Sequence, residues 1–404
     1  MHRTPLAANP PRLPARLPEG FRAATGRVGI RSGPGDDLAI VVADGAASTA
    51  AVFTTNRFAA APIELSRRHL AESGGRCRAL LVNAGNANAA TGAAGHEDAR
   101  RTVDVLAASI DAAPREVLVN STGVIGRRLP IDDLCKAIPR LAAALDGNAV
   151  AELARAIMTT DTAPKAAERR IPAADGGEIS LVGVCKGAGM IRPDMATMIG
   201  IVLTDAEVDP PSLDALLRHA CERSFNRLSI DGDTSTNDAV FAMASGRRGT
   251  PADPATLDGA FQELCLELAR MIAADGEGAR RVVEVRVRGA ATETDARNVA
   301  ETVGSSLLVR TAIAGGDPNW GRIVAALGRT RADFDPQRVR IEANGLSLFD
   351  RGAPAGGDLA GLAAAFTRDH VELAIDLAAG GCEDRFLTCD LTAEYVRINA
   401  DYTT

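Results

Sequence analysis

Short runs rich in Val, Leu and Ile alternate with amphipathic stretches along the first half of the chain. Residues 37–44 and 76–85 have the composition of buried strands, whereas residues 96–111 place apolar side chains at helical spacing. Residues 178–190 and 197–206 form two further apolar runs with no helical pattern between them. Because such consecutive strands suit hairpin pairing, antiparallel or mixed sheets fit better than a regular βαβ array. The alternation therefore predicts an α/β layered sandwich.

The second half of the chain also contains both helical and strand periodicity. Asp253 followed by Pro254 is a good helix start, and the helix should end at the DGEG of residues 275–278. In residues 283–288, Val alternates with Glu and Arg, which is the period of a strand with one buried face. Trp320, the only tryptophan, and nearby Arg322 are expected to be structural or interfacial. Four later runs are also expected to be strands: residues 323–328, 338–349, 370–380 and 394–402.

Composition and charge narrow the class of protein. A chain of 404 residues with 46% hydrophobic side chains can bury a large core and should divide into two or more lobes. The net charge of -7 disfavours nucleic-acid binding, which needs a basic face. We therefore expect a small-molecule substrate and no nucleic-acid partner.

The cysteines and the apolar runs predict a location for the protein. Seven cysteines form an odd set without a CxxC pair, which suits neither a disulfide framework nor a zinc site. The first 26 residues carry Arg and Pro without the apolar centre of a signal peptide, and no later run is long enough to span a membrane. We therefore expect a cytoplasmic protein with a short, loosely held N-terminal arm and no membrane partner.

Several familiar catalytic and metal patterns do not fit this sequence. It has neither a P-loop nor a Gly-x-Gly-x-x-Gly fingerprint, and its five histidines lie outside the Gly-rich and polar clusters, which disfavours a Ser-His-Asp triad. Residues 231–238 resemble the start of an EF-hand loop, but Thr236 stands where Gly is needed and Ala242 where Glu is needed. No metal site is predicted.

The segment KGAGMIRPDMATMIG, residues 186–200, is the most unusual part of the sequence. Its glycines allow backbone conformations that other residues avoid, Pro193 fixes a turn, and Thr197 then opens an apolar strand. The simplest interpretation is a loop that enters a strand. A chemical alternative is that the Thr197 hydroxyl attacks the carbonyl of Ala196, so that an N-to-O acyl shift and hydrolysis release Thr197 as a new N-terminus. Its α-amine, with an unperturbed pKa of about 7.7 to 8.0, would then be a usable base.

Nine ordered blocks resemble the ornithine acetyltransferase family, the arginine-biosynthesis enzymes also called glutamate N-acetyltransferases. Besides the segment above they are VFTTNRFAAAPI, VNAGNANAATG, VNSTGVIGRRLP, MTTDTAPK, SFNRLSIDGDTSTND, DGEGARR, DPNWGRI and CDLTAEYVRINADYTT, which together span nearly the whole chain. The resemblance implies two mainly antiparallel sheets between helical layers, a fold related to that of self-cleaving aminopeptidases. Two small departures are Arg192-Pro193-Asp194, where Ala-Pro-Asn is common, and Arg280-Arg281, where Thr-Lys is common.

The resemblance assigns the chemistry to named residues. Thr197 matches the family's cleavage residue and acyl-carrying nucleophile, so the cut would fall between Ala196 and Thr197. Thr122 and Gly123, in the VNSTG block, match the oxyanion hole, where a hydroxyl and a backbone N–H face the developing charge. Without the family, these two residues would equally suit a tight turn after a strand.

Five further positions match substrate-binding residues of the family. Lys186 would hold a substrate carboxylate or lower the pKa of the new α-amine. Glu277 would receive the cationic amine of ornithine or orient the reacting amine. A solvated surface residue is the plain alternative for both. The remaining matches are Asn399, Thr404 and Thr160, the last with Thr159 and Thr162 as close alternatives.

The family's reaction is ping-pong. N2-acetyl-L-ornithine would acetylate the Thr197 hydroxyl and ornithine would leave, after which L-glutamate would accept the acetyl group as N-acetylglutamate. No metal or dissociable cofactor is implied; some members also use acetyl-CoA as a co-substrate, and the sequence does not decide this. The resemblance further implies an N-terminal (alpha) chain, residues 1–196, and a C-terminal (beta) chain, residues 197–404, with two of each forming a heterotetramer.

Two other functions compete at this level. A self-processing amidase or aminopeptidase-like hydrolase would share the architecture, because an acyl-threonine that is open to water hydrolyses. It would release acetate whether or not glutamate is present. A specialised-metabolism acetyltransferase would keep the scaffold but use another acceptor, and it would not turn over N-acetylornithine.

Overall fold

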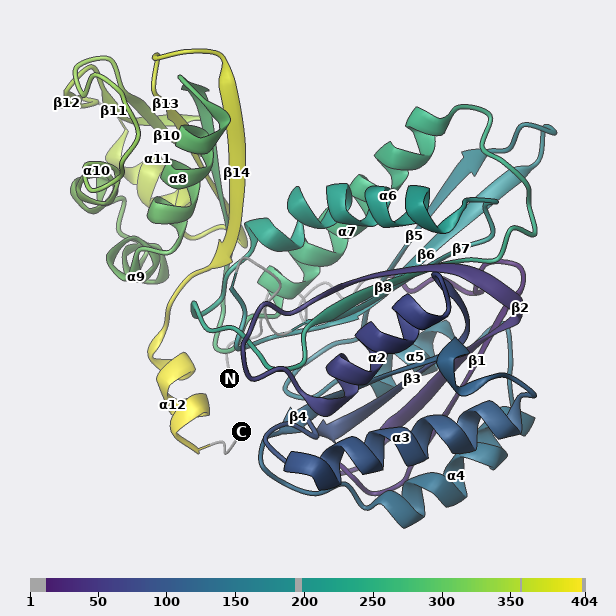
Figure 1. Cartoon of the computed structure of the whole chain (residues 1–404). Coiled ribbons are helices and arrows are strands. Elements are labelled where there is room, and N and C mark those ends of the chain that lie inside the picture. Colours follow the sequence, from purple (N-terminus) through teal and green to yellow (C-terminus); the bar gives the residue numbers. More distant parts are fainter. Residues whose placement is uncertain (1–11, 193–197, 357, 402–404) are drawn as a thin grey trace. The chain divides into compact units, whose positions relative to one another are not determined.

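A computed structural model of the chain describes residues 12–192, 198–356 and 358–401 (Figure 1). Its contacts divide the chain into two compact units, as the length predicts. The larger unit holds the described residues of 12–226 together with 233–268, and the smaller unit holds 227–232 and 269–401. The predicted cut between Ala196 and Thr197, the last residue Thr404 and residues 1–11 of the expected N-terminal arm lie outside the described residues.

The larger unit alternates strands with helices, and the runs that open the first half of the sequence are strands and helices as predicted. Its strands are β1 (Phe21–Gly26), β2 (Leu38–Phe53), β3 (Arg76–Asn86), β4 (Val117–Val124), β5 (Lys165–Pro172), β6 (Glu178–Lys186), β7 (Ile199–Thr204) and β8 (Ala239–Ala244). Its helices are α2 (Ala61–Glu72), α3 (Gly92–Ser109), α4 (Ile131–Ala143), α5 (Val150–Ala156), α6 (Pro210–Glu222) and most of α7 (Pro254–Ala274). Helix α7 ends just before DGEG, as expected.

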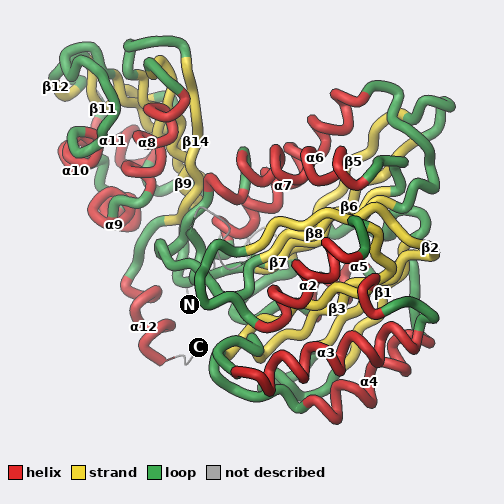
Figure 2. Tube along the Cα trace, in the orientation of Figure 1, coloured by secondary structure: helices red, strands yellow, loops and turns green. Residues whose placement is uncertain are grey.

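The long strand β2 organises the eight-stranded sheet of this unit. The strand order is β4-β3-β2-β8-β7-β6-β5, with β1 also on β2. The β3–β4 and β7–β8 pairs are parallel, and the other five pairs are antiparallel. The first part of β2 pairs with β1 and β3, and residues 48–53 pair with β8 beyond a register shift after Val42. Side chains from both parts, such as Val41 and Ala51, share one buried core, so the sheet folds over that core into two layers (Figure 2).

Helices cover the outer faces of these layers. α3 and α4 pack on β2 and β3 through a second core that includes Leu81, Leu106 and Leu134. On the other layer, Gly183 of β6 lets α7 approach closely, because a Cβ there would meet Leu268 Cδ1 at 2.7 Å. The predicted fold, mainly antiparallel sheets between helical layers, is confirmed.

The smaller unit contains a six-stranded sheet and its own core. The sheet has the order β12-β11-β10-β13-β9-β14, in which β9 and β13 are parallel and the other neighbours antiparallel. Trp320 stacks on Phe349 with 5.9 Å between ring centroids, which suits its expected packing role. The elements are β9 (Val282–Ala290), α8 (Glu293–Gly304), α9 (Leu307–Gly315), α10 (Trp320–Leu327), β10 (Arg340–Ala343), β11 (Leu346–Asp350), β12 (Ala353–Pro354), α11 (Leu359–Ala365), β13 (His370–Asp376), β14 (Cys382–Cys389) and α12 (Ala393–Asp401).

Two predicted strands of the second half are helices instead. Residues 323–328 fall mainly in α10, which begins where the Asn319 side chain accepts the Arg322 N–H at 3.1 Å. Of the predicted strand 394–402, the described residues 394–401 fall in α12, where Arg397 donates to the Glu394 carboxylate at 2.8 Å across one turn. Both predictions were wrong because a short apolar run cannot separate the two periods, whereas the cap and the charge spacing do.

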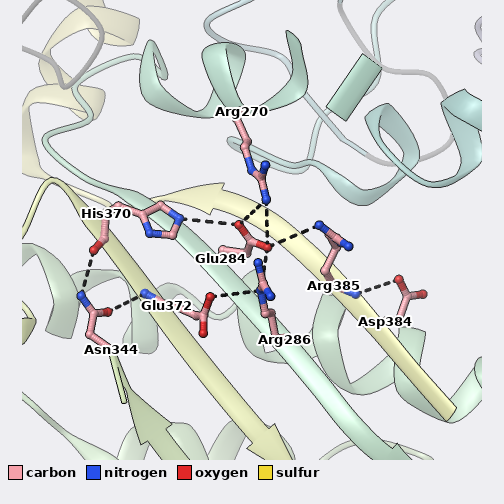
Figure 3. Close-up of polar contacts among 8 residues, drawn as sticks. All are labelled: Arg270, Glu284, Arg286, Asn344, His370, Glu372, Asp384 and Arg385. Atoms are coloured by element: carbon pink, nitrogen blue, oxygen red, sulfur yellow. Dashed lines mark hydrogen bonds and ion pairs between the residues drawn. The ribbon is translucent and has the colours of Figure 1, made fainter. Parts of the chain in front are cut away.

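Glu284 of β9 departs from the predicted alternation. Val283, Val285 and Val287 are buried as expected, but Glu284, on the opposite face, is also only 1% exposed. Arg286 Nε donates to its Oε1 at 2.9 Å, and Arg270 Nη2 lies 3.2 Å from its Oε2. Four basic side chains surround this carboxylate (Figure 3): Arg270, Arg286, His370 and Arg385.

Glu284→Gln is expected to destabilise the chain near neutral pH by about 3 kcal/mol. Burial alone would raise the pKa of Glu284, but the His370 contact and the arginine charges outweigh it and lower the pKa from 4.5 to about 2. Because the folded pKa lies below the unfolded one, this stabilisation is complete above about pH 4.5 and is lost as the pH falls towards 2. Urea unfolding at pH 7 and at pH 3 measures it: the difference between wild type and variant should shrink at pH 3.

Glu372→Gln is the matched control. Glu372 contacts the same Arg286 at 3.0 Å, but its side chain is 34% exposed. An ion pair that water screens in this way contributes about 1 kcal/mol or less. Equal destabilisation by the two substitutions would contradict the role assigned to the buried carboxylate.

Candidate active site

Thr122 and Gly123 lie at the end of β4, and their backbone is tightly constrained. Thr122 is buried, and Gly123 pairs with Gly85 of the parallel strand β3. Gly123 has φ +132°, and a Cβ there would stand 2.2 Å from the carbonyl carbon of Gly85. Only glycine fits such a conformation and such a close approach of two backbones. Thr122 and Gly123 therefore lie in a rigid strand end, and the turn follows them at residues 125–126, so the alternative of a tight turn at these two residues is wrong.

A network of buried amide side chains fixes this strand end. Asn120 Oδ1 accepts the N–H of Ser121, and Asn120 Nδ2 donates to Asn237 O at 3.0 Å. Asn237 Nδ2 in turn donates to Ala87 O at 2.7 Å. Ser121 Oγ donates to Asn83 Oδ1 at 2.6 Å. Since a buried amide is costly to leave unpaired, this network holds the backbone at Thr122 and Gly123 in one position.

The same network connects the strand end to the predicted cleavage segment. Asn237 lies two residues before Ala239, which opens β8, pairs with Ile199 and donates its N–H to Met198 O at 3.1 Å. Ile199 also pairs with Lys186, the last residue of β6. Lys186 and Met198, which precede and follow the segment 187–197, therefore lie at the end of the larger unit that carries Thr122. Strands β6 and β7 flank this segment as the sequence predicts.

Lys186 is buried beside an aspartate that the sequence analysis did not single out. Lys186 Nζ lies 3.9 Å from Asp161 Oδ2, and Lys165 Nζ lies 2.6 Å from Asp161 Oδ1. The Lys165 and Asp161 side chains are 0% exposed, so this is a buried ion pair. The plain alternative of a solvated surface lysine is therefore wrong for Lys186, because its side chain is only 4% exposed.

Asp161 is held in its charged form. Burial would raise its pKa, but the charges of Lys165 and Lys186 and the hydrogen bonds from Lys165 and the Thr159 N–H outweigh burial and lower it. Thr160 directly precedes Asp161 in the loop between α5 and β5. Because Asp161 lies beside Lys186, Thr160 is at the same end of the sheet as Lys186.

Glu277 and Asn399 meet in the smaller unit. Asn399 Nδ2 donates to Glu277 Oε2 at 2.8 Å. Helix α12 is held next to the DGEG turn, because Thr392 Oγ1 donates to Gly278 O at 2.8 Å. A Cβ on Gly278 would lie 2.5 Å from the Tyr395 N atom, so the helix start and the turn touch. The half-buried position of Glu277 corrects its plain alternative as a fully exposed residue.

The predicted site residues therefore form two described groups. The larger unit holds Thr122 and Gly123 at the end of β4 and Lys186 at the end of β6, with Thr160 in the loop before β5, and the smaller unit joins Glu277 to Asn399. Thr197, Ala196 and Thr404 lie outside the described residues. Sequence reasoning missed the supporting residues, although each stands in a quoted block: Asn120 in VNSTG, Asn237 in DTSTND, and Asp161 and Lys165 in MTTDTAPK.

The described residues contain neither a metal-binding cluster nor a membrane-spanning helix. No group of three or more His, Cys, Asp or Glu side chains among them is arranged to hold a metal ion. None of the helices in the described part of the chain has the length and apolar character needed to cross a membrane.

Comparison with known protein families shows to which family this chain belongs. The sequence profile of the ArgJ family matches residues 22–404 of the chain. The chain belongs to the ArgJ family. Among similar proteins, the arginine biosynthesis bifunctional protein ArgJ of Nitratidesulfovibrio vulgaris is 46% identical over 389 residues, which cover 95% of this chain and 98% of that protein. The ArgJ protein of Thermus thermophilus is 46% identical over 392 residues, covering 97% of this chain and 100% of its own.

A solved ornithine acetyltransferase is also similar in sequence. The ornithine acetyltransferase of Mycobacterium tuberculosis, solved in complex with ornithine, is 37% identical to this chain. The match covers 45% of this chain and 96% of that one, with a TM-score of 0.41. The family profile and the two ArgJ relatives confirm the resemblance inferred from nine sequence blocks at the level of the ArgJ family.

Proposed function

We propose that this ArgJ-family chain transfers the acetyl group of N2-acetyl-L-ornithine to L-glutamate. The support is family membership over residues 22–404, together with relatives named as bifunctional proteins of arginine biosynthesis. The observation that carries the mechanism is the meeting of two features at one end of the larger unit. Met198, which follows the cleavage segment, accepts the N–H of Ala239. Two residues before Ala239, the carbonyl of Asn237 accepts a hydrogen bond from Asn120, which lies next to the constrained Thr122–Gly123 strand end.

In the proposed mechanism the chain first cuts itself between Ala196 and Thr197. The freed α-amine of Thr197 takes the hydroxyl proton as Oγ attacks the acetyl carbonyl of N-acetylornithine. Ornithine leaves with that proton on its amine, and the acetyl group stays on Oγ. The amine of glutamate then attacks the ester carbonyl, its proton passes through the Thr197 amine to Oγ, and N-acetylglutamate departs.

Other side chains supply binding and charge stabilisation. The Thr122 hydroxyl and the Gly123 N–H would hold the oxyanion of each tetrahedral intermediate, where one such donor contributes about 2.7 to 4 kcal/mol. Lys186 and Thr160 would bind a substrate carboxylate, and Glu277 with Asn399 and Thr404 would receive the substrate amine. No metal or dissociable cofactor takes part. The alpha and beta chains remain together as a cytoplasmic heterotetramer.

Intact-mass measurement of the purified wild type tests this function. We expect two fragments, residues 1–196 and 197–404, and one acetyl group on the second fragment after incubation with N-acetylornithine. Adding glutamate should discharge that acetyl group into N-acetylglutamate, and acetyl-CoA in place of N-acetylornithine tests the second donor. Acetate release at the same rate with and without glutamate would instead identify a hydrolase, and an uncut, unacetylated chain would overturn the proposal.

A further inference from the structure

Three hydrogen-bond donors and a second, more distant ammonium surround the carboxylate of Asp161 in the larger unit. Oδ1 accepts from Lys165 Nζ at 2.6 Å and from the Gly187 N–H at 2.7 Å. Oδ2 accepts the Thr159 N–H at 3.0 Å and lies 3.9 Å from Lys186 Nζ. A side chain with this many specific partners and no exposure fixes the groups around it.

The strand register explains why these groups meet. Lys165 opens β5 and pairs with Cys185, the residue before Lys186 on β6. Lys186 pairs with Ile199 and is the last residue of β6 in the sheet, so the sheet no longer holds the peptide N–H of Gly187. Asp161 accepts that N–H instead, which makes it the anchor of the first peptide of the cleavage segment.

The two lysines contact Asp161 differently. Lys165 forms a short hydrogen-bonded ion pair with it, whereas Lys186 is beyond hydrogen-bond distance and is attracted through charge alone. The short pair therefore satisfies the carboxylate without using the N–H donors of Lys186. If Lys165 were absent, the buried carboxylate would need a new partner, and the nearest cation is Lys186.

We propose that Asp161 and Lys165 are positioning residues for the acyl-transfer site. Asp161 orients the Lys186 ammonium and the Gly187 peptide, and Lys165 compensates Asp161 so that the Lys186 donors address the substrate carboxylate. This role rests on the proposed function, in which Lys186 binds substrate. Neither residue touches the reacting atoms; both act through Lys186 and the start of the segment that contains Thr197.

Lys165→Met is the first test. The variant should fold, because Lys186 and two backbone N–H groups still compensate Asp161. With Asp161 drawn onto Lys186, the KM for N-acetylornithine should rise about 10- to 100-fold, a range typical of a misplaced binding group, while kcat changes much less. Asp161→Asn combined with Lys165→Met leaves Lys186 without its anchoring charge and should raise the KM similarly and also slow self-cleavage. This double variant also serves if the single one does not fold.

Asp205→Asn is the matched control, because Asp205 contacts β6 near its start, whereas Asp161 lies at its end. Asp205 is also a buried carboxylate that accepts a β6 backbone N–H, that of Ser180, at 2.7 Å. Its loss should lower the melting temperature and leave the KM within about twofold of wild type, because no substrate group depends on it.

The outcomes separate positioning from general stability. A raised KM in the Lys165 variants together with an unchanged KM in Asp205→Asn supports the proposal. A KM within twofold of wild type in the folded Lys165 variants overturns it, and so does an equal KM increase in Asp205→Asn. Failure of the proposed function itself is recognised separately, because the wild type would then not transfer acetyl groups at all.

Discussion

Thr197→Ala is expected to leave one uncut chain of 41.9 kDa, whereas we expect two fragments from the wild type. The substitution removes the hydroxyl that is proposed to attack the Ala196 carbonyl, and without the cut no α-amine would be available as a base. Acetyl transfer should fall by about a thousandfold or more, because nucleophile and base are lost together. Denaturing gel electrophoresis and intact mass report the cut, and the appearance of N-acetylglutamate reports the transfer.

Thr197→Ser is the matched control for this prediction. Serine keeps a hydroxyl at the same position, so the chain should still cut itself and carry an acetyl group, although at an altered rate. If Thr197→Ala is cut at the same bond as the wild type, the nucleophile is another residue. If Thr197→Ser and Thr197→Ala are equally inactive, the methyl group of threonine matters more than its hydroxyl, and the mechanism needs revision.

The sequence predicted most of the elements because their periods are long and clear. Residues 96–111 and 254–274 show unbroken helical spacing, and the strands around residues 186 and 199 are continuous apolar runs, so each matches its element in the structure. Residues 323–328 and 394–402 were misassigned because six to nine residues hold too little periodicity, and there local capping and ion pairs decide. Tertiary contacts also decided the burial of Glu284, whose arginine partners come from three separate elements.

The resemblance named candidate reacting residues but not the residues that support them. The resemblance named Thr122, Gly123 and Lys186 through motifs that lie far apart in the sequence. Asp161 and Lys165 were quoted in the same blocks, yet their pairing depends on the β5–β6 register, which no local pattern specifies. The bend of β2, which folds the sheet over its core and so brings β4 and β8 to one end, likewise follows from packing across the whole unit.

Gly123→Ala is expected to be the most damaging change at a residue that the structure describes. The new Cβ would lie 2.2 Å from the Gly85 carbonyl carbon and 2.5 Å from the Asn86 nitrogen, and both of these are backbone atoms that cannot rotate away. The φ of +132° adds strain for any residue with a side chain, which by itself costs about 1 to 3 kcal/mol. Strands β3 and β4 would have to separate, and the amide proposed for the oxyanion hole would turn with them. Transfer should fall by about 100-fold or more even in the protein that still folds.

Gly126→Ala separates the steric effect from the effect of glycine itself. Gly126 lies three residues farther along the chain, in the turn after β4, with φ +80°, but a Cβ there would have no heavy atom within 4 Å. Gly126→Ala should therefore lose only about 1 kcal/mol of stability through backbone strain, and its acetyl transfer should stay close to that of the wild type. Thermal melting and transfer assays on both variants provide the comparison. Similar melting temperatures and full transfer in both would mean that the β3–β4 end tolerates separation, and Gly123 would then lose its assigned place at the oxyanion.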